Sequence, residues 1–450
     1  MEESSTQILS KFLHSLKYED LPESTINIIK QCAVDYFASA WNSYGSPLFY
    51  KYVDYAISLG VVDRFPIIGG YRTSLYWSVF ANAAISHITE VDDIHRASTM
   101  HVGISIFPVV LGIAKERKLS GKEIVQSIAC GYEASIRVGE FLGRSHYNIF
   151  HTTGTAGSFG AAAAAAKALG LDAEKTAHAL GHAGTQANAL WQFLDDGALA
   201  AKAFHPGRAA QNGIAAAYLA AQGIPGATRI LEGQRGYGSY ATCTPNLEAV
   251  TANLGSPDKV EEICFKSYPT CGQTHSMLDA LRDLLAEHRL AASDVREIEA
   301  RVYQQAINIA GIAQPRTLEE AKFSLPTCLA IMLVMGDLTF SNMTWETVSQ
   351  PAVREAAAKI RLVFDPGIDA KFPATRPCRI IVRTRDGREL SRENYYRTGD
   401  PEKPMSLARM RDKFRDLTGH SLSRDRQNMI LDWCEALPDS VMTTDLFLNN

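Results

Sequence analysis

Up to about residue 262, apolar side chains recur at the three- and four-residue spacing of helices that bury one face. One such series runs from Ile26 to Phe37, and a second runs from Trp77 to Ile88. A third helix is expected over 121–142, because Ser120 and Glu123 have the spacing of a capping box ahead of another apolar face. The first part of the chain is therefore predicted to be helical.

The segment 156–221 is more than a third alanine. Within it, Gly170 suits the C-terminus of one helix and Asp172 the N-cap of the next. Small side chains let helices approach closely, so we expect tightly packed helices here.

After about residue 290 the pattern changes to the alternation of apolar and polar residues that is typical of strands. Three strands are expected, at 298–302, 360–364 and 380–384, and Asp386-Gly387 predicts a type I′ hairpin turn after the third. From Pro404 the spacing is helical again. We expect this tail to rejoin the helical part, leaving a second domain that mixes helix and sheet.

Composition narrows the class of protein. In 450 residues, 45 Lys and Arg against 49 Asp and Glu give a net charge of −4, which lacks the broad positive surface of a nucleic-acid binder. The acidic start and the absence of a long apolar run argue against export and against a membrane span. Eight cysteines without a C-x-x-C pair argue against a zinc ribbon or a disulfide scaffold. A reducing, cytoplasmic location is expected.

Four short segments carry the candidate chemistry. The first, 86–101, combines carboxylates and imidazoles that can transfer protons or bind a metal, or can simply cap a solvated helix end. The second, 150–160, is rich in glycine, and its backbone amides from Gly154 to Gly157 could bind an anion; close helix packing is the alternative. The third contains Lys202 and a predicted His205-Pro-Gly207 turn. The fourth, 265–275, lies where the pattern changes, and ligand clefts favour such boundaries.

Together these segments, which include FHTTGTAGSFGAAAAAAKALGLD, AKAFHPGRAAQNGIAAAYLA and FKSYPTCGQTH, resemble the MmgE/PrpD family over nearly the whole chain. The resemblance implies a mainly α fold, with a large helical domain built from both chain ends (1–262 and 403–450). A smaller α+β lid domain would span 263–402. It also implies a homodimer, a small polycarboxylate substrate, and no metal or organic cofactor.

The resemblance also implies site residues. The expected catalytic residues are His101, His151, Asp93, Lys202 and Lys266, with Asp92 or Asp93 orienting His101. The expected substrate-binding residues are Glu90, Asp92, Gly154, Thr155, His205, Tyr268 and His275. Glu90 stands where relatives commonly have an aspartate.

The resemblance indicates a cofactor-independent lyase that removes a proton next to a carboxylate, most simply a dehydratase of a citrate-like acid. The alternatives are an epimerase of an iminodisuccinate-like dicarboxylate, a cis-aconitate-type decarboxylase, and a non-catalytic binding protein of the same fold. Three positions depart from the family pattern and weigh against decarboxylation. Ile94 replaces a threonine of the decarboxylase, Val102 a frequent proline, and Thr327 a tyrosine.

Overall fold

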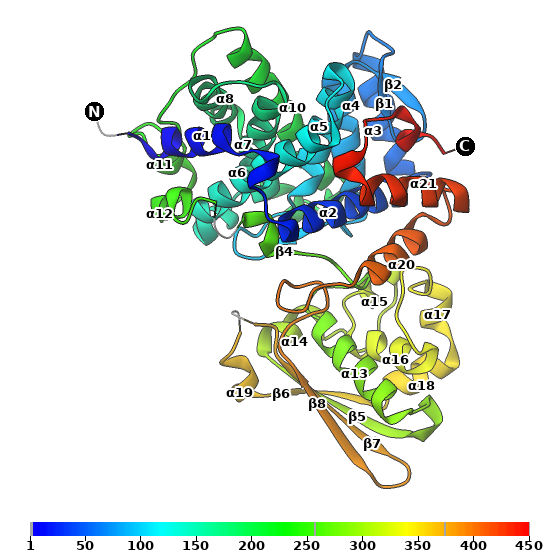
Figure 1. Cartoon of the computed structure of the whole chain (residues 1–450). Helices are drawn as coiled ribbons and strands as arrows, with labels where there is room; N and C mark the ends of the chain where they lie inside the picture. Colours follow the sequence, from blue (N-terminus) through cyan, green and yellow to red (C-terminus); the bar gives the residue numbers. More distant parts are fainter. Residues whose placement is uncertain (1–2, 256–257, 373–374, 450) are drawn as a thin grey trace. The chain divides into compact units, whose positions relative to one another are not determined.

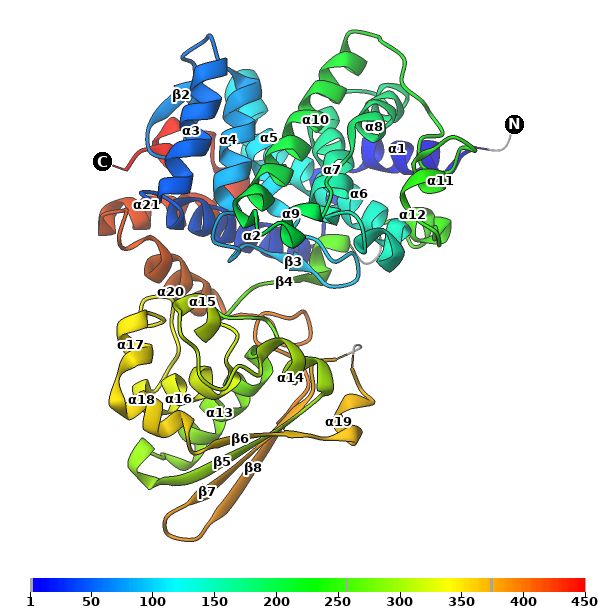
Figure 2. The same ribbon diagram turned by 180° about the vertical axis from the view of Figure 1, so that it is seen from behind.

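The computed structural model describes residues 3–255, 258–372 and 375–449. The chain folds into two compact units, Met1–Cys264 with Met410–Asn450, and Phe265–Arg409 (Figures 1 and 2). The boundaries expected from the sequence were 262/263 and 402/403. The predicted mainly α fold class is confirmed, and the second unit is the one that carries an extended sheet. No helix in the described ranges is long and apolar enough to cross a membrane.

The first unit is built from helices, whose main members are α1 (Ser5–Ser15), α2 (Glu23–Asn42), α3 (Pro47–Leu59), α4 (Leu75–Ser86), α5 (Gly103–Arg117), α6 (Gly121–Tyr147), α7 (Thr152–Ala168), α8 (Ala173–Gln186), α10 (Phe204–Ala221) and α21 (Arg424–Glu435). Its shorter helices include α9 (Gln192–Asp195), α11 (Tyr237–Ala241) and α12 (Leu247–Thr251). The sequence predicted a purely helical domain, but this unit also contains two short strand pairs. β1 (Phe65–Ile67) pairs with β2 (Tyr71–Thr73), and β3 (Ile94–His95) pairs with β4 (Ile263–Cys264).

The alanine-rich α7 lies among α6, α8 and α10, as Figure 1 shows. A Cβ on Gly160 would lie 2.7 Å from the carbonyl oxygen of Gly131 in α6, and one on Gly213 of α10 would lie 2.5 Å from the backbone of Ala161. Only glycine fits at such approaches. The expectation of closely packed helices is confirmed, and α7 reaches the middle of the unit because its side chains are so small.

The helix ends follow the predicted signals. The Ser120 and Glu123 capping box forms at the start of α6, and non-helical backbone at Gly143 interrupts this helix one residue beyond the predicted end. The Asp172 side chain accepts a hydrogen bond from the Lys175 amide at 2.8 Å and caps α8. The His205-Pro-Gly207 turn, however, is wrong: these residues form the first turn of α10, where proline is tolerated because its missing N–H would have no helical partner.

The C-terminal tail packs into the first unit. Helix α20 (Leu407–Thr418) crosses the unit boundary, and α21 lies against α2. The buried Lys413 ammonium of α20 donates to Asp35 at 2.5 Å and to the carbonyl oxygen of Val91 at 2.8 Å. The tail therefore holds the backbone immediately before Asp92.

The second unit is a four-stranded sheet with helices over one face, a layering that Figure 2 shows. The strand order is β6 (Ile360–Phe364), β5 (Val295–Val302), β7 (Cys378–Thr384), β8 (Glu389–Asn394); β5 and β6 are parallel and the other pairs antiparallel. Helices α13 (His275–His288) and α16 (Leu325–Met335) pack against the sheet. The other helices are α14 (Gln304–Ala310), α15 (Leu318–Ala321), α17 (Trp345–Ser349), α18 (Pro351–Ala357) and α19 (Pro366–Asp369).

The three predicted strands are confirmed as β5, β6 and β7, but the predicted turn type after β7 is wrong. Four residues, Arg385 to Arg388, connect β7 and β8, and of these only Gly387 has a positive φ, of 92°. A type I′ turn needs two such residues. The Asp386 side chain accepts from the Thr384 hydroxyl, and one left-handed glycine then suffices to start β8.

Candidate functional site

Four imidazoles from separate helix ends meet inside the first unit. His87 follows α4, His101 precedes α5, His151 is the N-cap of α7 and His205 lies in the first turn of α10. The ring centroids are 4.6 Å apart for His87 and His101, 5.8 Å for His87 and His151, and 5.3 Å for His151 and His205. We call these four residues the imidazole cluster. Three of them were predicted site residues.

Asp92 is the carboxylate of this cluster. It is buried, and its oxygens lie 3.1 and 3.2 Å from His87 Nδ1 and 2.8 Å from His101 Nδ1. The His87 contact is a hydrogen bond, and the His101 contact is the shorter of the two. Burial by itself raises the pKa of Asp92, but the two imidazoles outweigh it and hold this pKa well below the usual range. Asp92 is therefore an anion shared by two rings.

Asp93 points elsewhere. Its oxygens accept hydrogen bonds from the backbone N–H groups of Val102 at 3.2 Å and Gly103 at 3.0 Å, and from the Tyr132 hydroxyl. Burial, with a smaller effect of the Asp35 charge, raises the pKa of Asp93 to about 7. Of the two candidates for orienting His101, the geometry places Asp92 against the ring, while Asp93 caps the start of α5.

Lys202 provides the positive charge beside the cluster. Its ammonium lies 2.5 Å from the carboxylate of Glu90, and the two side chains are 17% and 48% exposed. Its charge is among the causes that lower the pKa of His101, His151 and His205. Since its counterion is half exposed, Lys202 can exchange Glu90 for a carboxylate of a bound ligand.

Three of the imidazoles, those of His101, His151 and His205, are uncharged at neutral pH in the unliganded protein. Burial, followed by neighbouring positive charge, lowers the pKa of both His101 and His205 to about 4, with the Asp92 charge opposing the shift at His101. Burial likewise lowers the pKa of His151 well below the ordinary value. The cluster can therefore accept protons, and a polyanionic ligand would raise these pKa values.

The glycine-rich segment does not present free amides where they were expected. The Gly154 amide donates to the carbonyl oxygen of His151 at 2.9 Å, and a Cβ on Gly154 would lie 2.4 Å from Ala189 Cβ. The Thr155 hydroxyl lies 2.7 Å from His146 Nε2, outside the cluster. The alternative of close packing accounts for this segment, and the geometry does not support anion binding by these amides.

Three expected residues belong to the second unit. The Tyr268 hydroxyl donates to Asp279 at 2.7 Å and accepts from Arg282 at 2.8 Å, and His275 Nε2 donates to the Thr270 carbonyl oxygen at 3.1 Å. Burial, then the charge of Arg397, lowers the pKa of His275 to about 3. These polar groups are used inside the unit. Lys266 is half buried, close enough for its charge to act on His275.

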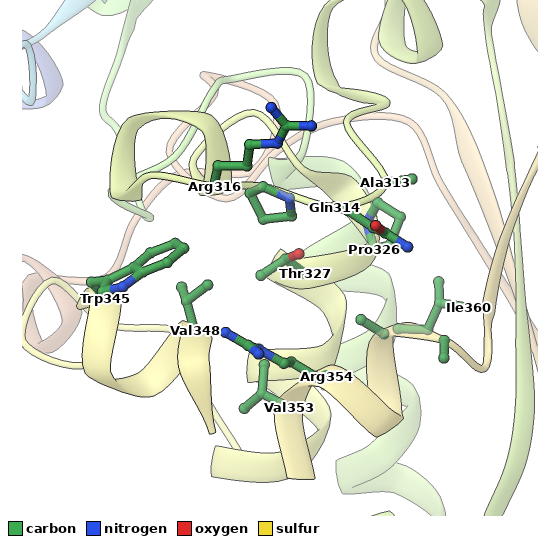
Figure 3. Close-up of a pocket in the computed structure, with 13 residues that line it drawn as sticks. Ala313, Gln314, Arg316, Pro326, Thr327, Trp345, Val348, Val353, Arg354 and Ile360 are labelled. Carbon is green, nitrogen blue, oxygen red and sulfur yellow. The ribbon is translucent and has the colours of Figure 1, made fainter. Parts of the chain in front are cut away.

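The second unit also contains a cavity of about 700 Å³ (Figure 3). Figure 3 shows the Trp345 ring and the Arg354 side chain next to Thr327, whereas the Arg316 guanidinium points away from these three. Thr327, where the family pattern has a tyrosine, accepts a hydrogen bond from Ser324 at 2.8 Å. Among the described lining residues there are two arginines and no acidic side chain.

Two groups of described residues bring potential metal ligands within 4.8 Å of one another, namely His87, Asp92 and His101, and His95, Glu140 and Glu262. In the second, the Lys259 ammonium already lies 3.1 Å from Glu140 and 2.9 Å from Glu262. In the first, Asp92 accepts the His87 hydrogen bond. Hydrogen bonds and ion pairs thus account for both groups.

His87 was not among the expected site residues, although it lies in the segment that was singled out. A signal was present in the sequence: His87 is three residues after Ala84 and seven after Phe80, which puts it on the buried face of that helix.

Comparison with known proteins finds similarity to the same family along nearly the whole chain. The family models for the MmgE/PrpD N-terminal domain and the MmgE/PrpD C-terminal domain match residues 7–249 and 268–437. Cis-aconitate decarboxylase of Mus musculus is 26% identical over 98% of this chain and 92% of its own length. The Homo sapiens enzyme of that name is 26% identical over 99% and 95%, and that of Aspergillus terreus 25% over 95% and 92%.

Proposed function

The chain belongs to the MmgE/PrpD family, and on this premise we propose that it is a lyase that decarboxylates a small tricarboxylic acid similar to cis-aconitate. The observation that carries the proposal is the imidazole cluster with Asp92 inside it and Lys202 beside it. The full-length similarity to three cis-aconitate decarboxylases supports this reaction over the dehydration that the sequence first favoured.

Lys202 binds the substrate by exchanging its ion pair with Glu90 for a substrate carboxylate. The bond is charge-assisted and stronger than a neutral one. Because the Glu90 side chain is 48% exposed, it returns to water at little cost. We keep Lys266 as a proposed second cation, to be tested by its own variant.

His101 handles the proton. When the bond to the departing carboxylate breaks, CO₂ leaves and the electron pair shifts through the neighbouring double bond. The carbon at the far end of that system then takes one proton, so the products are a dicarboxylate and CO₂. His101 supplies the proton because a bound trianion raises the pKa of His101 from about 4, and Asp92 stabilises the resulting imidazolium.

Dehydration of a citrate-like acid is the second candidate. It is favoured by the departures at Ile94, Val102 and Thr327, and by the uncharged state of the His101 ring, which leaves a nitrogen able to take a proton. Dehydration needs proton removal next to a carboxylate and loss of hydroxide, with no loss of carbon.

The test is to incubate the protein with ¹³C-carboxyl-labelled cis-aconitate, citrate and 2-methylcitrate in D₂O and to follow the products by NMR. Release of labelled CO₂ with one deuterium in the product supports decarboxylation. An alkene without carbon loss supports the dehydratase, and deuterium exchange with inversion and no alkene supports an epimerase. No reaction with any acid would contradict the proposed function.

A further inference from the structure

His87 lies at the centre of the imidazole cluster. It is 1% exposed, and its Nδ1 reaches both oxygens of Asp92, at 3.1 and 3.2 Å. Its ring meets that of His101 edge-on and runs nearly parallel to that of His151, at an interplanar angle of 24°. The other ring nitrogen, Nε2, is buried without a hydrogen-bond partner among the described residues.

These contacts fix a proton on Nδ1 of His87. Asp92 is an anion and can only accept hydrogen bonds, so His87 Nδ1 must carry the proton of their bond. Leaving the buried Nε2 without a hydrogen-bond partner destabilises the fold, so the arrangement needs a reason other than stability.

We propose that His87 is a positioning residue that donates to Asp92 and holds this carboxylate against Nδ1 of His101. His101 Nδ1 lies 2.8 Å from Asp92, and the Nδ1–H of His87 is a second donor to the same carboxylate. With Asp92 held, Nδ1 of His101 keeps its proton and Nε2 is left to exchange protons with a substrate. This inference rests on the proposed function only in that His101 is the proton-transfer group.

The backbone around Asp92 cannot replace this hydrogen bond. The carbonyl oxygen of Val91 is held by Lys413, but Glu90 before it has a left-handed φ of 54° and lies half exposed. Asp93 on the other side is committed to the start of α5. The direction of the Asp92 side chain is therefore set by His87 and His101.

Two variants separate positioning from simple filling of the core. In His87→Asn the amide NH₂ takes the place of Nδ1–H and can still donate to Asp92, whereas His87→Phe keeps a ring of similar size without a donor. Both remove the buried Nε2. Both should still lower the melting temperature, because His87→Asn leaves part of the space of the ring empty and His87→Phe takes a hydrogen-bond donor away from Asp92. Only His87→Phe should release Asp92.

The first measurement is the tautomer of His101, followed by NMR on protein labelled with ¹⁵N-histidine. We expect wild type and His87→Asn to keep the proton on Nδ1, and His87→Phe to give a mixture of tautomers. The second is kinetics: His87→Phe should lose roughly tenfold to a hundredfold in kcat with KM changed by less than about threefold, and His87→Asn should recover most of it.

The inference fails if His87→Phe leaves the His101 tautomer and kcat as in wild type. It also fails if the two variants lose activity equally and in step with their melting temperatures, since His87 would then only fill space. The NMR measurement needs no substrate, so a protein inactive on every acid tested would contradict the proposed function while the tautomer result still decides the role of His87.

Discussion

Asp92 and Asp93 are adjacent and both buried, yet they differ in charge at neutral pH. Two imidazoles outweigh burial at Asp92 and keep its pKa low, whereas burial and the nearby Asp35 raise the pKa of Asp93 to about 7. One is a permanent anion beside the proposed proton-transfer residue. The other caps a helix and is partly protonated. Two neighbouring carboxylates thus differ in charge and in the groups they contact.

His101 and Asp92 should affect turnover more than binding. We expect His101→Ala to lower kcat by roughly a hundredfold to ten-thousandfold, because general acid–base catalysis typically contributes that much, while substrate binding stays near normal. Asp92→Asn should lower kcat in the same direction. Calorimetric ligand binding and kcat measured together provide the check. Normal kcat with a sharply lowered melting temperature would make His101 structural.

Asp93 should make stability depend on pH. Its pKa is raised from 3.8 to about 7, so the folded protein holds a proton that the unfolded chain has lost. The free energy of unfolding should therefore be highest below about pH 4 for this group, and should fall as pH rises to about 7. Asp93→Asn cannot lose a proton and still accepts from the α5 amides. Its melting temperature, relative to wild type, should rise between pH 5 and pH 8; a constant difference would contradict the pKa assignment.

Lys202 should affect binding and turnover together. Removal of a charge-assisted hydrogen bond worth about 1.5–3 kcal/mol predicts a loss in kcat/KM of roughly tenfold to a hundredfold for Lys202→Ala. We expect the same loss in kcat/KM for Lys266→Ala.

Lys259→Ala is the matched control, because Lys259 also bridges carboxylates in the first unit but lies outside the imidazole cluster. It should change stability and leave kcat/KM near wild type. Equal effects of Lys202 and Lys259 would remove the special role of Lys202.

The helices and strands could be predicted because their apolar periodicity records which face is buried. α2, α4, α6 and the strands β5, β6 and β7 all follow that pattern. Local turns were harder to predict than helices and strands. Pro206 and Gly207 suit a turn or a helix start, and the packing of α10 selects the helix. The choice between Asp92 and Asp93 likewise depends on a loop whose left-handed Glu90 carries no sequence signal.

The close approach of α6 and α7 makes a testable element-level prediction. In Gly160→Ala the new Cβ would lie 1.7 Å from Ser135 Oγ and 2.7 Å from the Gly131 carbonyl oxygen. Overpacking of this kind costs about 1–3 kcal/mol of unfolding free energy. Adding Ser135→Ala removes the side-chain clash but not the backbone one, so it should recover only part of the loss in denaturant unfolding. Full recovery would mean that the two backbones are free to move apart.

At the scale of the whole molecule, the family was recognisable from four short segments, but the reaction was not. The imidazoles, Lys202 and Asp92 suit dehydration, decarboxylation and epimerisation alike, since each involves one proton and a stabilised negative charge. Similarity to decarboxylases at about 26% identity shifts the balance between these reactions. The order of helices along the sequence could not show that His87 contacts Asp92, His101 and His151. These contacts form because the ends of separate helices meet in the fold.

The last prediction links the C-terminal tail to the site. In Lys413→Met, Asp35 loses its buried partner and the Val91 carbonyl oxygen, next to Asp92, loses its donor. Breaking a buried ion pair typically costs about 3–5 kcal/mol, because one charge is left uncompensated. We expect the free energy of unfolding, measured with denaturant, to fall by that amount, and kcat to fall as well, since the backbone before Asp92 is released.

Adding Asp35→Asn removes the uncompensated charge and should restore much of the stability. It leaves the Val91 carbonyl oxygen without its donor, so kcat should stay low. Recovery of both would mean that the tail affects the site only through stability, and recovery of neither would show that the ion pair is not what holds the tail in place.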